Sequence, residues 1–479
     1  MKGTERTFVI VGAGLAGAKA AESLRGWGFD GRVVLIGDEP VRPYERPPLS
    51  KAYMRGTATF EDAAVHPGAF YADHDIDLRC STVVDAIDPV GRTLSLNPGG
   101  KLPFDQLLLA TGARARPLDV PGSDLPGVTC LRTASDADAI RTAARPGARV
   151  VIVGAGWLGT EVAASLRELD VDVALIDRSA VPFQRSLGGE VGAVFLALHA
   201  EHGVAMHPGL TVTAVRGSTA VEEVELSDGT ILPADLIVVG LGAVPNTGLA
   251  SAAGIAVHDG ILVDEELRTS TPGIFAAGDV ANVEYPVFGS RARVAHWWTA
   301  LTQGPVAAAN MVGNHARCDW IPVFTSKQYD LLVEYTGHAP RWDRVVFRGD
   351  PATRQFVAFW LDEGRVVAGM TANVAGLAGP IRDLVASRQP AKPAQLADPG
   401  VDLVALAQAA AAPPGRSGQG AHTQGEEHQH SGSGAISEGL RQWYESCPCC
   451  MSQALPDVKQ ALDEEMAFST AAAHTSRST

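Results

Sequence analysis

Near the start of the chain the sequence runs Phe8-Val9-Ile10-Val11-Gly12-Ala13-Gly14-Leu15-Ala16-Gly17. A short run of β-forming apolar residues leads directly into a turn rich in glycine. The alanine-rich segment that follows, Ala16 to Leu24, has the composition of a helix. A second β-rich segment, Arg32 to Ile36, comes next. The order strand, tight turn, helix, strand predicts one unit of a parallel α/β fold.

The three glycines have separate tasks in such a turn. Gly12 permits the sharp bend, Gly14 lets the backbone approach a pyrophosphate, and Gly17 allows the strand and helix to pack closely. The phosphates then lie at the helix N-terminus, where unpaired N–H groups point at them. Asp38 and Glu39 follow the second strand, where a carboxylate can accept hydrogen bonds from a ribose. We therefore expect a dinucleotide site here.

The same arrangement returns near residue 150. A strand from Ala148 to Val153 runs into a turn and helix that carry Gly154, Gly156 and Gly159. Two such turns in one polypeptide admit two nucleotides. A hydride donor and a flavin have to meet face to face, so the two nucleotide units are expected to share one cleft.

The second unit ends in Asp177, directly after its second strand. A carboxylate at this place favours the free 2′-hydroxyl of NAD and repels the 2′-phosphate of NADP. Arg178 is adjacent and could soften that preference. NADH is therefore the expected nucleotide, with NADPH less favoured.

Composition limits the other classes of function. The chain has 479 residues, 46% of them hydrophobic and 19% charged, which is ordinary for a globular protein of several domains. A net charge of −15 argues against nucleic acid or an anionic membrane as a partner. A strand begins close to Met1, and no apolar run reaches the ~18 residues of a membrane span. We expect a soluble, cytoplasmic protein.

Further β-rich segments flank turn signals. Thr93 to Leu96 and Leu107 to Leu109 lie on either side of a Pro-Gly-Gly turn, and Val224 to Leu226 and Leu236 to Val239 lie on either side of Asp228-Gly229. Both patterns are typical of hairpins. From about Ile321 onward, strands with turns between them predict a separate α+β domain.

Several motifs together resemble those of the FAD-dependent ferredoxin reductases. In chain order they are Val9 to Gly17, Arg46-Pro47-Pro48-Leu49-Ser50-Lys51, Ala110-Thr111-Gly112, Leu131-Arg132-Thr133 and Ala277-Gly278-Asp279. Enzymes of this family reduce the two-iron ferredoxins of P450 and ring-hydroxylating dioxygenase systems. The chain is also similar, more loosely, to NADH oxidoreductases of the apoptosis-inducing-factor type. The similarity runs from about residue 7 to about residue 405.

The resemblance implies a glutathione-reductase-like α/β fold, with two Rossmann-like dinucleotide-binding domains and a C-terminal α+β interface domain. The implied domains are an FAD domain (residues 1–115 and 242–320), an NAD domain (116–241) and the interface domain (321–405). A disordered linker (406–436) and a helical tail that contains cysteines (437–479) follow.

The resemblance also implies the site residues. Those expected to bind FAD are Gly12, Gly14, Ala16, Gly17, Asp38, Lys51, Val84, Arg132, Asp279 and Trp297. Those expected to bind NAD are Gly154, Gly156, Gly159 and Asp177. Lys51 and Glu161 fall where the family has a catalytic charge pair beside the flavin and nicotinamide. A solvated glutamate in the first turn of its helix is the alternative for Glu161.

The chain departs from the family at two places and from its disulfide-reducing relatives at a third. Ala295 stands where the family usually has a glutamate, and Thr325 to Tyr329 replaces the family's W-S-D-Q-Y stretch. Disulfide reductases of this fold carry a cysteine pair near Arg46 to Lys51, and this chain has none there. Electrons are therefore expected to leave the flavin outward, without an internal disulfide.

The end of the chain carries Cys447, Cys449 and Cys450 outside the resemblance. Three thiols are too few for a four-cysteine iron–sulfur site, although a linker histidine (His422, His428 or His430) could complete a zinc site. The interpretation we favour is a helical docking segment with incidental cysteines and no metal site.

The leading hypothesis is an NADH-dependent FAD oxidoreductase that passes electrons to a two-iron (2Fe–2S) ferredoxin serving a P450 or oxygenase system. One alternative is a flavin reductase whose tail cysteines reduce a disulfide or metal ion. Another is a flavin-bound interaction protein that senses redox state. The protein is expected to be a monomer or a homodimer.

Overall fold

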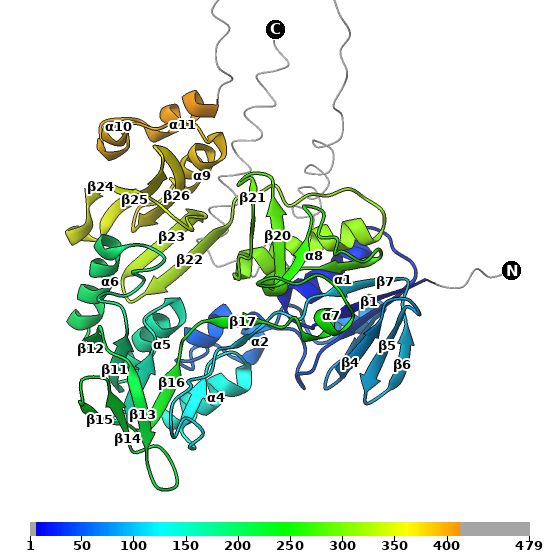
Figure 1. The fold of residues 1–479 in the computed structure, drawn as a ribbon, viewed down its shortest axis with the longest axis horizontal. Coiled ribbons are helices and arrows are strands. Elements are labelled where there is room, and N and C mark those ends of the chain that lie inside the picture. The colour runs from blue at the N-terminus through cyan, green and yellow to red at the C-terminus, as the bar shows by residue number, and fades with distance from the viewer. Residues whose placement is uncertain (1–5, 412–479) are drawn as a thin grey trace, which may run out of the picture. The chain divides into compact units, whose positions relative to one another are not determined.

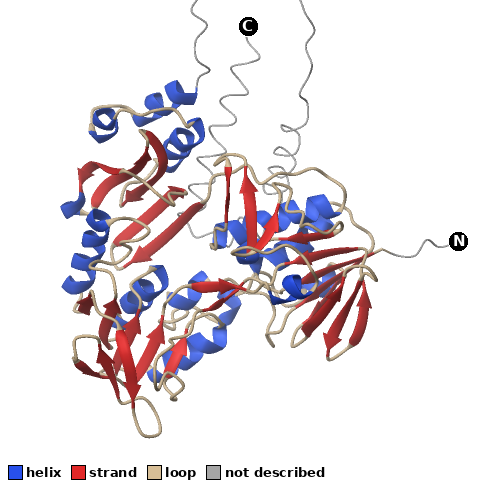
Figure 2. Cartoon of the chain, in the orientation of Figure 1, coloured by secondary structure: helices blue, strands red, loops and turns tan. Residues whose placement is uncertain are grey.

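The computed structural model describes residues 6–411. They divide into two compact units, shown by chain position in Figure 1 and by secondary structure in Figure 2. The first unit runs to Val333 and includes Pro351–Arg354, and the second comprises Glu334–Asp350 and the chain from Gln355. The linker from residue 412 and the cysteine-containing tail lie outside the described residues.

The first unit contains a parallel sheet built around the amino-terminal strand. Its order is β19-β7-β1-β2-β3, and every neighbouring pair is parallel. The strands are β1 (Thr7–Val11), β2 (Arg32–Ile36), β3 (Ile76–Arg79), β7 (Gln106–Leu109) and β19 (Ile274–Ala276). Helix α1 (Leu15–Gly26) connects β1 to β2 and packs against α8 (Trp297–Met311). Residues after 270 thus return to the sheet that residue 7 begins.

A second parallel sheet in the same unit has the order β12-β11-β10-β16-β9. Its strands are β9 (Val128–Cys130), β10 (Arg149–Val153), β11 (Asp172–Asp177), β12 (Ala205–Pro208) and β16 (Leu236–Val239). Helix α5 (Trp157–Arg167) connects β10 to β11, and α6 (Gly189–Glu201) leads to β12. The two parallel sheets confirm the α/β class with two Rossmann-like units.

Two of the hairpins expected from the sequence pair differently. β5 (Thr93–Asn97) pairs across its turn with β6 (Gly100–Pro103), and β7 pairs with β1 instead. Likewise β14 (Glu223–Leu226) pairs with β15 (Ile231–Pro233), and β16 pairs with β10. The reason is burial, because the apolar segments of β7 and β16 are covered on both faces, as strands of a parallel sheet are.

The remaining elements of the first unit are short. Antiparallel pairs join β4 (Val83–Asp88) to β5, β13 (Val212–Arg216) to β14, β8 (Ala113–Ala115) to β17 (Ala243–Pro245), and β20 (Ala281–Tyr285) to β21 (Ser290–Ala292), while β18 (Ile261–Val263) is parallel to β20. The short helices are η1 (Pro47–Ser50), α2 (Phe60–Ala63), α3 (Phe70–Asp73), α4 (Ala134–Ala143), α7 (Gly248–Ala252), η2 (Gly278–Val280) and η3 (Pro351–Thr353). Strand β22 (Val323–Gln328) also belongs to the first unit, and β23 (Leu331–Gly337) begins in the first unit and ends in the second.

The second unit is α+β, as the sequence predicts. Its strands β24 (Arg344–Asp350) and β26 (Arg365–Ala372) both pair antiparallel with β25 (Gln355–Asp362). Helices α9 (Ala378–Ser387), α10 (Pro393–Ala397) and α11 (Leu403–Ala411) follow. Helix α11 continues past residue 405, where the sequence analysis begins the linker. Between residues 6 and 411 no helix combines the length and apolar character needed to cross a membrane.

The third glycine of each turn sets how closely its helix approaches its strand. A Cβ on Gly17 would lie 2.0 Å from the Gly12 carbonyl oxygen, and a Cβ on Gly159 would lie 1.9 Å from that of Gly154. Such contacts require the backbone to move, so no larger residue fits at either position.

Replacing the third glycine of the second turn should therefore destabilise the protein. We expect Gly159→Ala to lower the free energy of unfolding by about 2–3 kcal/mol, because the helix must move away from the strand. Gly189→Ala on α6 is the matched control, since a Cβ there meets nothing within 4 Å, and it should change stability by less than about 0.5 kcal/mol. Urea unfolding checks both variants, and equal midpoints would contradict the packing argument.

Candidate functional site

The two glycine turns have nearly the same backbone geometry. The Gly12 amide donates to the Ile36 carbonyl at 2.8 Å, and the Gly154 amide donates to the Ile176 carbonyl at 2.8 Å. The φ angles of these two glycines are 112° and 108°, a region that favours glycine. The predicted internal duplication is thus present in three dimensions.

Both turns leave room for a ligand at a helix N-terminus. Gly14 and Gly156 are the N-caps of α1 and α5, and neither helix has a side-chain cap or an acidic residue in its first turn. A Cβ on either glycine would meet nothing within 4 Å. The first N–H groups of both helices are therefore available to an anion in open space, so the turns fit the pyrophosphate of a dinucleotide.

The acidic residues that end the two units differ in their contacts. Asp38 is exposed, so its carboxylate is open to a ribose. The carboxylate of Glu39 beside it already has partners within the protein, since it accepts from Tyr44 Oη at 2.5 Å and from Arg46 Nη2 at 2.9 Å. Asp177 accepts from the Ala155 amide at 2.7 Å, which ties its carboxylate to the second glycine turn.

The shared hydrogen bond of the two turns fixes their alignment. Because Ile36 corresponds to Ile176, Asp177 corresponds to Gly37 and not to Asp38. At the corresponding place in the first nucleotide unit stands Gly37, and the carboxylate follows one residue later, at Asp38. Sequence spacing alone does not show this offset.

Arg132 and Asp279 form an ion pair in the first unit, with Arg132 Nη2 2.7 Å from Asp279 Oδ2. Asp279 lies within η2 after its N-cap residue, Ala277, so it does not itself cap a helix. The Nε atom of Arg132 is buried and has no hydrogen-bond partner in the part of the chain that the structure describes. An unpaired buried guanidinium N–H favours an acceptor from outside the chain, and a polar cofactor would supply one.

Ala16 and Val84, two further residues expected to bind FAD, lie beside different parts of the first nucleotide unit. A Cβ built on Gly278 would be 3.1 Å from the Ala16 Cβ, which places Ala16 beside the residue that precedes Asp279. Val84 is buried on β4, and the loop before it is tied down by the Thr82 amide, which donates to the Gly37 carbonyl at 2.9 Å. Val84 therefore lies near the acidic end of β2.

Trp297 is the first residue of α8. It and Trp298 pack against a cluster of buried apolar residues that includes Leu15, Val65 and Leu301. Both indole rings thus take part in core packing. The Trp297 indole N–H is buried, and its hydrogen bond with the Glu45 carboxylate opposes the rise that burial causes in the pKa of Glu45.

His296 is a site residue that sequence reasoning missed. Its Nδ1 caps α8 by accepting from the Trp298 amide at 3.3 Å. Burial lowers the pKa of His296 to about 4, with opposing influence from the negative charges of Asp279 and Glu161 and further lowering by Lys51. Influence from all three charges places a neutral imidazole among the predicted site residues. The only signal in the sequence was its place just before a helix.

Aromatic rings lie next to His296. The Phe324 ring centroid is 5.1 Å from that of His296 and 4.6 Å from that of Trp157. Trp157 directly follows the second glycine of the second turn, so this group spans both nucleotide units. Sequence analysis did not single out Trp157 or Phe324.

Lys51 and Glu161 form an ion pair between the two nucleotide units. Lys51 Nζ is 2.5 Å from Glu161 Oε2, and Ser50 Oγ donates to the same oxygen at 2.6 Å. Ser326 Oγ donates to Glu161 Oε1 at 2.7 Å. Only 10% of the Glu161 side chain is exposed, so the alternative of a solvated glutamate is wrong. The predicted pair is thus brought together, with Lys51 after η1 and Glu161 on α5.

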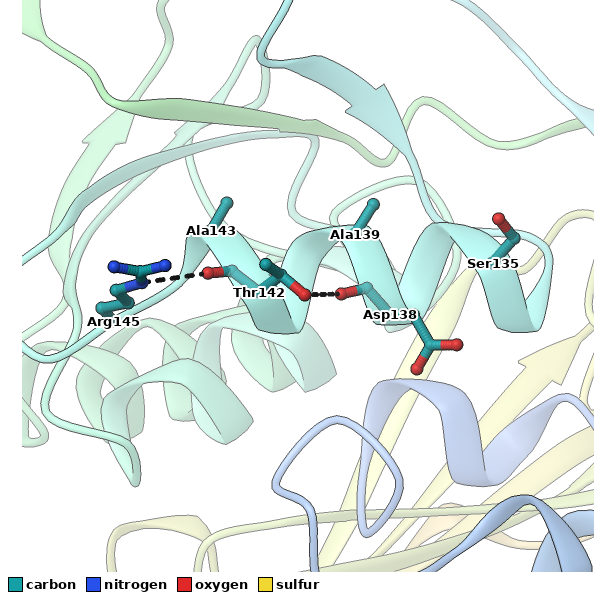
Figure 3. A pocket seen from close by; sticks show the side chains of 6 residues that line it. All are labelled: Ser135, Asp138, Ala139, Thr142, Ala143 and Arg145. Carbon is teal, nitrogen blue, oxygen red and sulfur yellow. Dashed lines mark hydrogen bonds between the residues drawn. The ribbon is translucent and has the colours of Figure 1, made fainter.

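A surface hollow elsewhere in the first unit runs along α4 (Figure 3). Its lining residues are Ser135, Asp138, Ala139, Thr142, Ala143 and Arg145. Thr142 Oγ1 donates to the Asp138 carbonyl at 2.7 Å, and Arg145 Nε donates to the Thr142 carbonyl at 3.3 Å. The Asp138 carboxylate accepts from Tyr53 Oη at 2.9 Å, and no predicted site residue lines the hollow, so we do not assign it a function.

Cysteine and metal chemistry have no visible place in residues 6–411. Cys80, Cys130 and Cys318 are free and separate, and burial raises the pKa of each thiol. Within the same residues no group of three His, Cys, Asp or Glu side chains could hold a metal ion. The tail cysteines and linker histidines lie outside the described residues.

Comparison with known proteins agrees with this geometry. Residues 6–304 match the pyridine nucleotide-disulphide oxidoreductase family, and residues 323–407 match a reductase C-terminal domain. Rhodocoxin reductase of Rhodococcus erythropolis is 37% identical over 83% of this chain and 93% of its own length. The ferredoxin–NAD(+) reductase component of the anthranilate 1,2-dioxygenase system of Burkholderia cepacia is 39% identical over 83% of this chain and 98% of its own length.

A solved structure is similar over the same region. Putidaredoxin reductase, in its covalent complex with putidaredoxin, superposes with a TM-score of 0.82 at 36% identity, covering 86% of this chain and 100% of that one. The resemblance found in the sequence is confirmed, and the cofactors are FAD and a nicotinamide nucleotide. The chain belongs to the pyridine nucleotide-disulphide oxidoreductase family.

Proposed function

We propose that this protein oxidises NADH through FAD and passes the electrons singly to a 2Fe–2S ferredoxin of an oxygenase or P450 system. The observation that carries the proposal is the Lys51–Glu161 ion pair, with a buried carboxylate and a partly exposed ammonium, which joins the two nucleotide units. A charge pair between two dinucleotide units suits a reaction in which two cofactors meet.

The two cofactors are assigned to the two glycine turns. FAD is proposed to lie in residues 1–115 and 242–320, with its phosphates at the α1 N-terminus and its ribose near Asp38. The unpaired Nε–H group of Arg132 supports a contact with one of its polar atoms. NADH is proposed to lie in residues 116–241, with its phosphates at the α5 N-terminus and Asp177 at its ribose.

When bound, the nicotinamide supplies a hydride, and the flavin can release two electrons one at a time. Lys51 would hold a positive charge where negative charge develops, and Glu161 would keep that ammonium in place through its ion pair. Neutral His296, whose Nδ1 is occupied by the helix cap, would present Nε2–H as a donor.

The acceptor is inferred from the relatives and from the cysteine inventory. The relatives include a ferredoxin–NAD(+) reductase component and a reductase solved in complex with putidaredoxin. The three separate cysteines of residues 6–411 supply no redox-active pair, which supports direct transfer to an external centre. Both alternatives that use the tail depend on residues outside the described chain. A cytoplasmic location and a monomeric or homodimeric state remain predictions.

Anaerobic stopped-flow absorbance tests the proposed function. We expect NADH to bleach the flavin band of the purified protein within seconds, and a 2Fe–2S ferredoxin added afterwards to be reduced. The control omits ferredoxin, so that the band stays bleached. Absence of bleaching would refute the NADH–FAD assignment, and bleaching without ferredoxin reduction would refute the acceptor.

The nucleotide preference can be tested at Asp177. We expect Asp177→Asn to lower the ratio of kcat/KM for NADH to that for NADPH about tenfold, because the charge that repels a 2′-phosphate is gone. The new amide also faces a backbone N–H, which slows both reactions, so the ratio is the informative quantity. Asp172→Asn, an exposed change at the start of the same strand, is the control. An unchanged ratio would show that Asp177 does not select the nucleotide.

A further inference from the structure

A row of buried polar side chains leads away from Glu161 and is not explained by cofactor binding. Ser326 and Gln328 are 3% and 1% exposed, and they lie two residues apart on β22, on the same side of the strand. Thr325 and Lys327 between and beside them are exposed. His199 on α6 is fully buried next to Gln328.

The distances connect these side chains in a single line. Ser326 Oγ is 2.7 Å from Glu161 Oε1, and Gln328 Nε2 is 3.3 Å from Ser326 Oγ. Gln328 Oε1 is 2.9 Å from His199 Nε2. The line therefore runs, within the first compact unit, from the ion pair between the two nucleotide-binding parts to His199 in the buried face of α6.

The direction of every hydrogen bond in the line follows from its charged end. Glu161 is ion-paired with Lys51 and so can only accept, which makes the Ser326 hydroxyl the donor. The hydroxyl has then used its one hydrogen and must accept from the Gln328 amide N–H. The amide oxygen consequently faces His199, whose Nε2 must carry a hydrogen.

The state of His199 agrees with that assignment. Burial lowers the pKa of His199 to about 4, the hydrogen bond to Gln328 opposes that shift, and the charge of His202 adds to it. His199 is therefore neutral at pH 7, with its single ring hydrogen on Nε2, and its Nδ1 has no partner among residues 6–411.

We propose that Ser326, Gln328 and His199 are positioning residues that hold the Glu161 carboxylate in the orientation that fixes Lys51. Ser50 and Lys51 engage Oε2, and the chain from β22 engages Oε1, so both carboxylate oxygens are held. Without Ser326 the carboxylate can rotate about its terminal bond, and the ammonium loses its fixed place. The consequence for hydride transfer rests on the proposed function, whereas the contacts themselves do not.

The test is a double-mutant cycle of Ser326→Ala and Glu161→Gln in the FAD-loaded protein. In the Glu161 background we expect Ser326→Ala to slow hydride transfer from NADH roughly tenfold with the NADH dissociation constant unchanged, as for a lost hydrogen bond to a charged group. In the Glu161→Gln background the same change should have less than about a twofold effect, because Ser326 acts through the carboxylate. Thr325→Ala, exposed on the same strand, should change nothing.

Thermal unfolding of the same proteins gives a readout independent of turnover. Ser326→Ala should lower the midpoint more when Glu161 is present than in the Glu161→Gln background. If Ser326→Ala does not retain flavin, Ser326→Cys keeps the side-chain size with a weaker donor and should show the same pattern at smaller amplitude.

The outcomes separate this proposal from the proposed function. If NADH does not bleach the flavin of the wild-type protein, the proposed function is refuted. The double-mutant cycle followed by thermal unfolding still tests whether Ser326 positions Glu161. A wild-type protein that is bleached, with equal effects of Ser326→Ala in both backgrounds, overturns the positioning role.

Discussion

The central interaction of this structure is an ion pair that is largely removed from water between two nucleotide-binding units. Burying an ammonium and a carboxylate carries a desolvation penalty of several kcal/mol per ion, which their attraction offsets only when further hydrogen bonds are present. Lys51 and Glu161 have those bonds, because Ser50 and Ser326 both donate to the carboxylate. Ser165 Oγ also donates to the Ser50 carbonyl at 2.7 Å, which ties the segment before Lys51 to α5. The pair is thus built into the contact between the units.

The glycine turns impose the second constraint. Each requires a glycine where its helix crosses its strand, and each leaves open space at the helix N-terminus. Because both turns share one geometry, each can hold the phosphates of a dinucleotide in the same way. The two nucleotide sites differ in the acidic residues that follow β2 and β11. The carboxylate of Asp38 stands one residue later in its nucleotide unit than that of Asp177 does in the other.

Much of this could be predicted from the sequence, because its signals are local. The strand, turn and helix around Gly12 and around Gly154 are encoded within a few residues, and the resemblance identified Lys51 and Glu161 as a pair. The pairing of the strands was harder to predict from the sequence. Leu107 to Leu109 follows a turn as a hairpin strand would, yet it pairs with β1, because its apolar run is buried on both faces. Periodicity does not distinguish these partners.

The residues around the Lys51–Glu161 pair were the hardest to predict from the sequence. Ser326 and Gln328 lie in a stretch that sequence analysis treated mainly as a departure from the family, and their role depends on contacts with residues far away in the chain. His296 gave no signal in the sequence beyond its place before a helix, and its capping role and its place among three charges appear only in the folded chain. Such long-range polar contacts have no periodic signature in a single sequence.

The central claim is that Lys51 and Glu161 stabilise each other across the two units, and a double-mutant cycle on unfolding measures this most directly. Lys51→Met and Glu161→Gln would be made singly and together, and the free energy of unfolding would be determined in urea. Each single change leaves a buried charge or dipole without its partner, so the account predicts a coupling of at least about 1 kcal/mol, with the double variant less destabilised than the sum. Additive effects would contradict it.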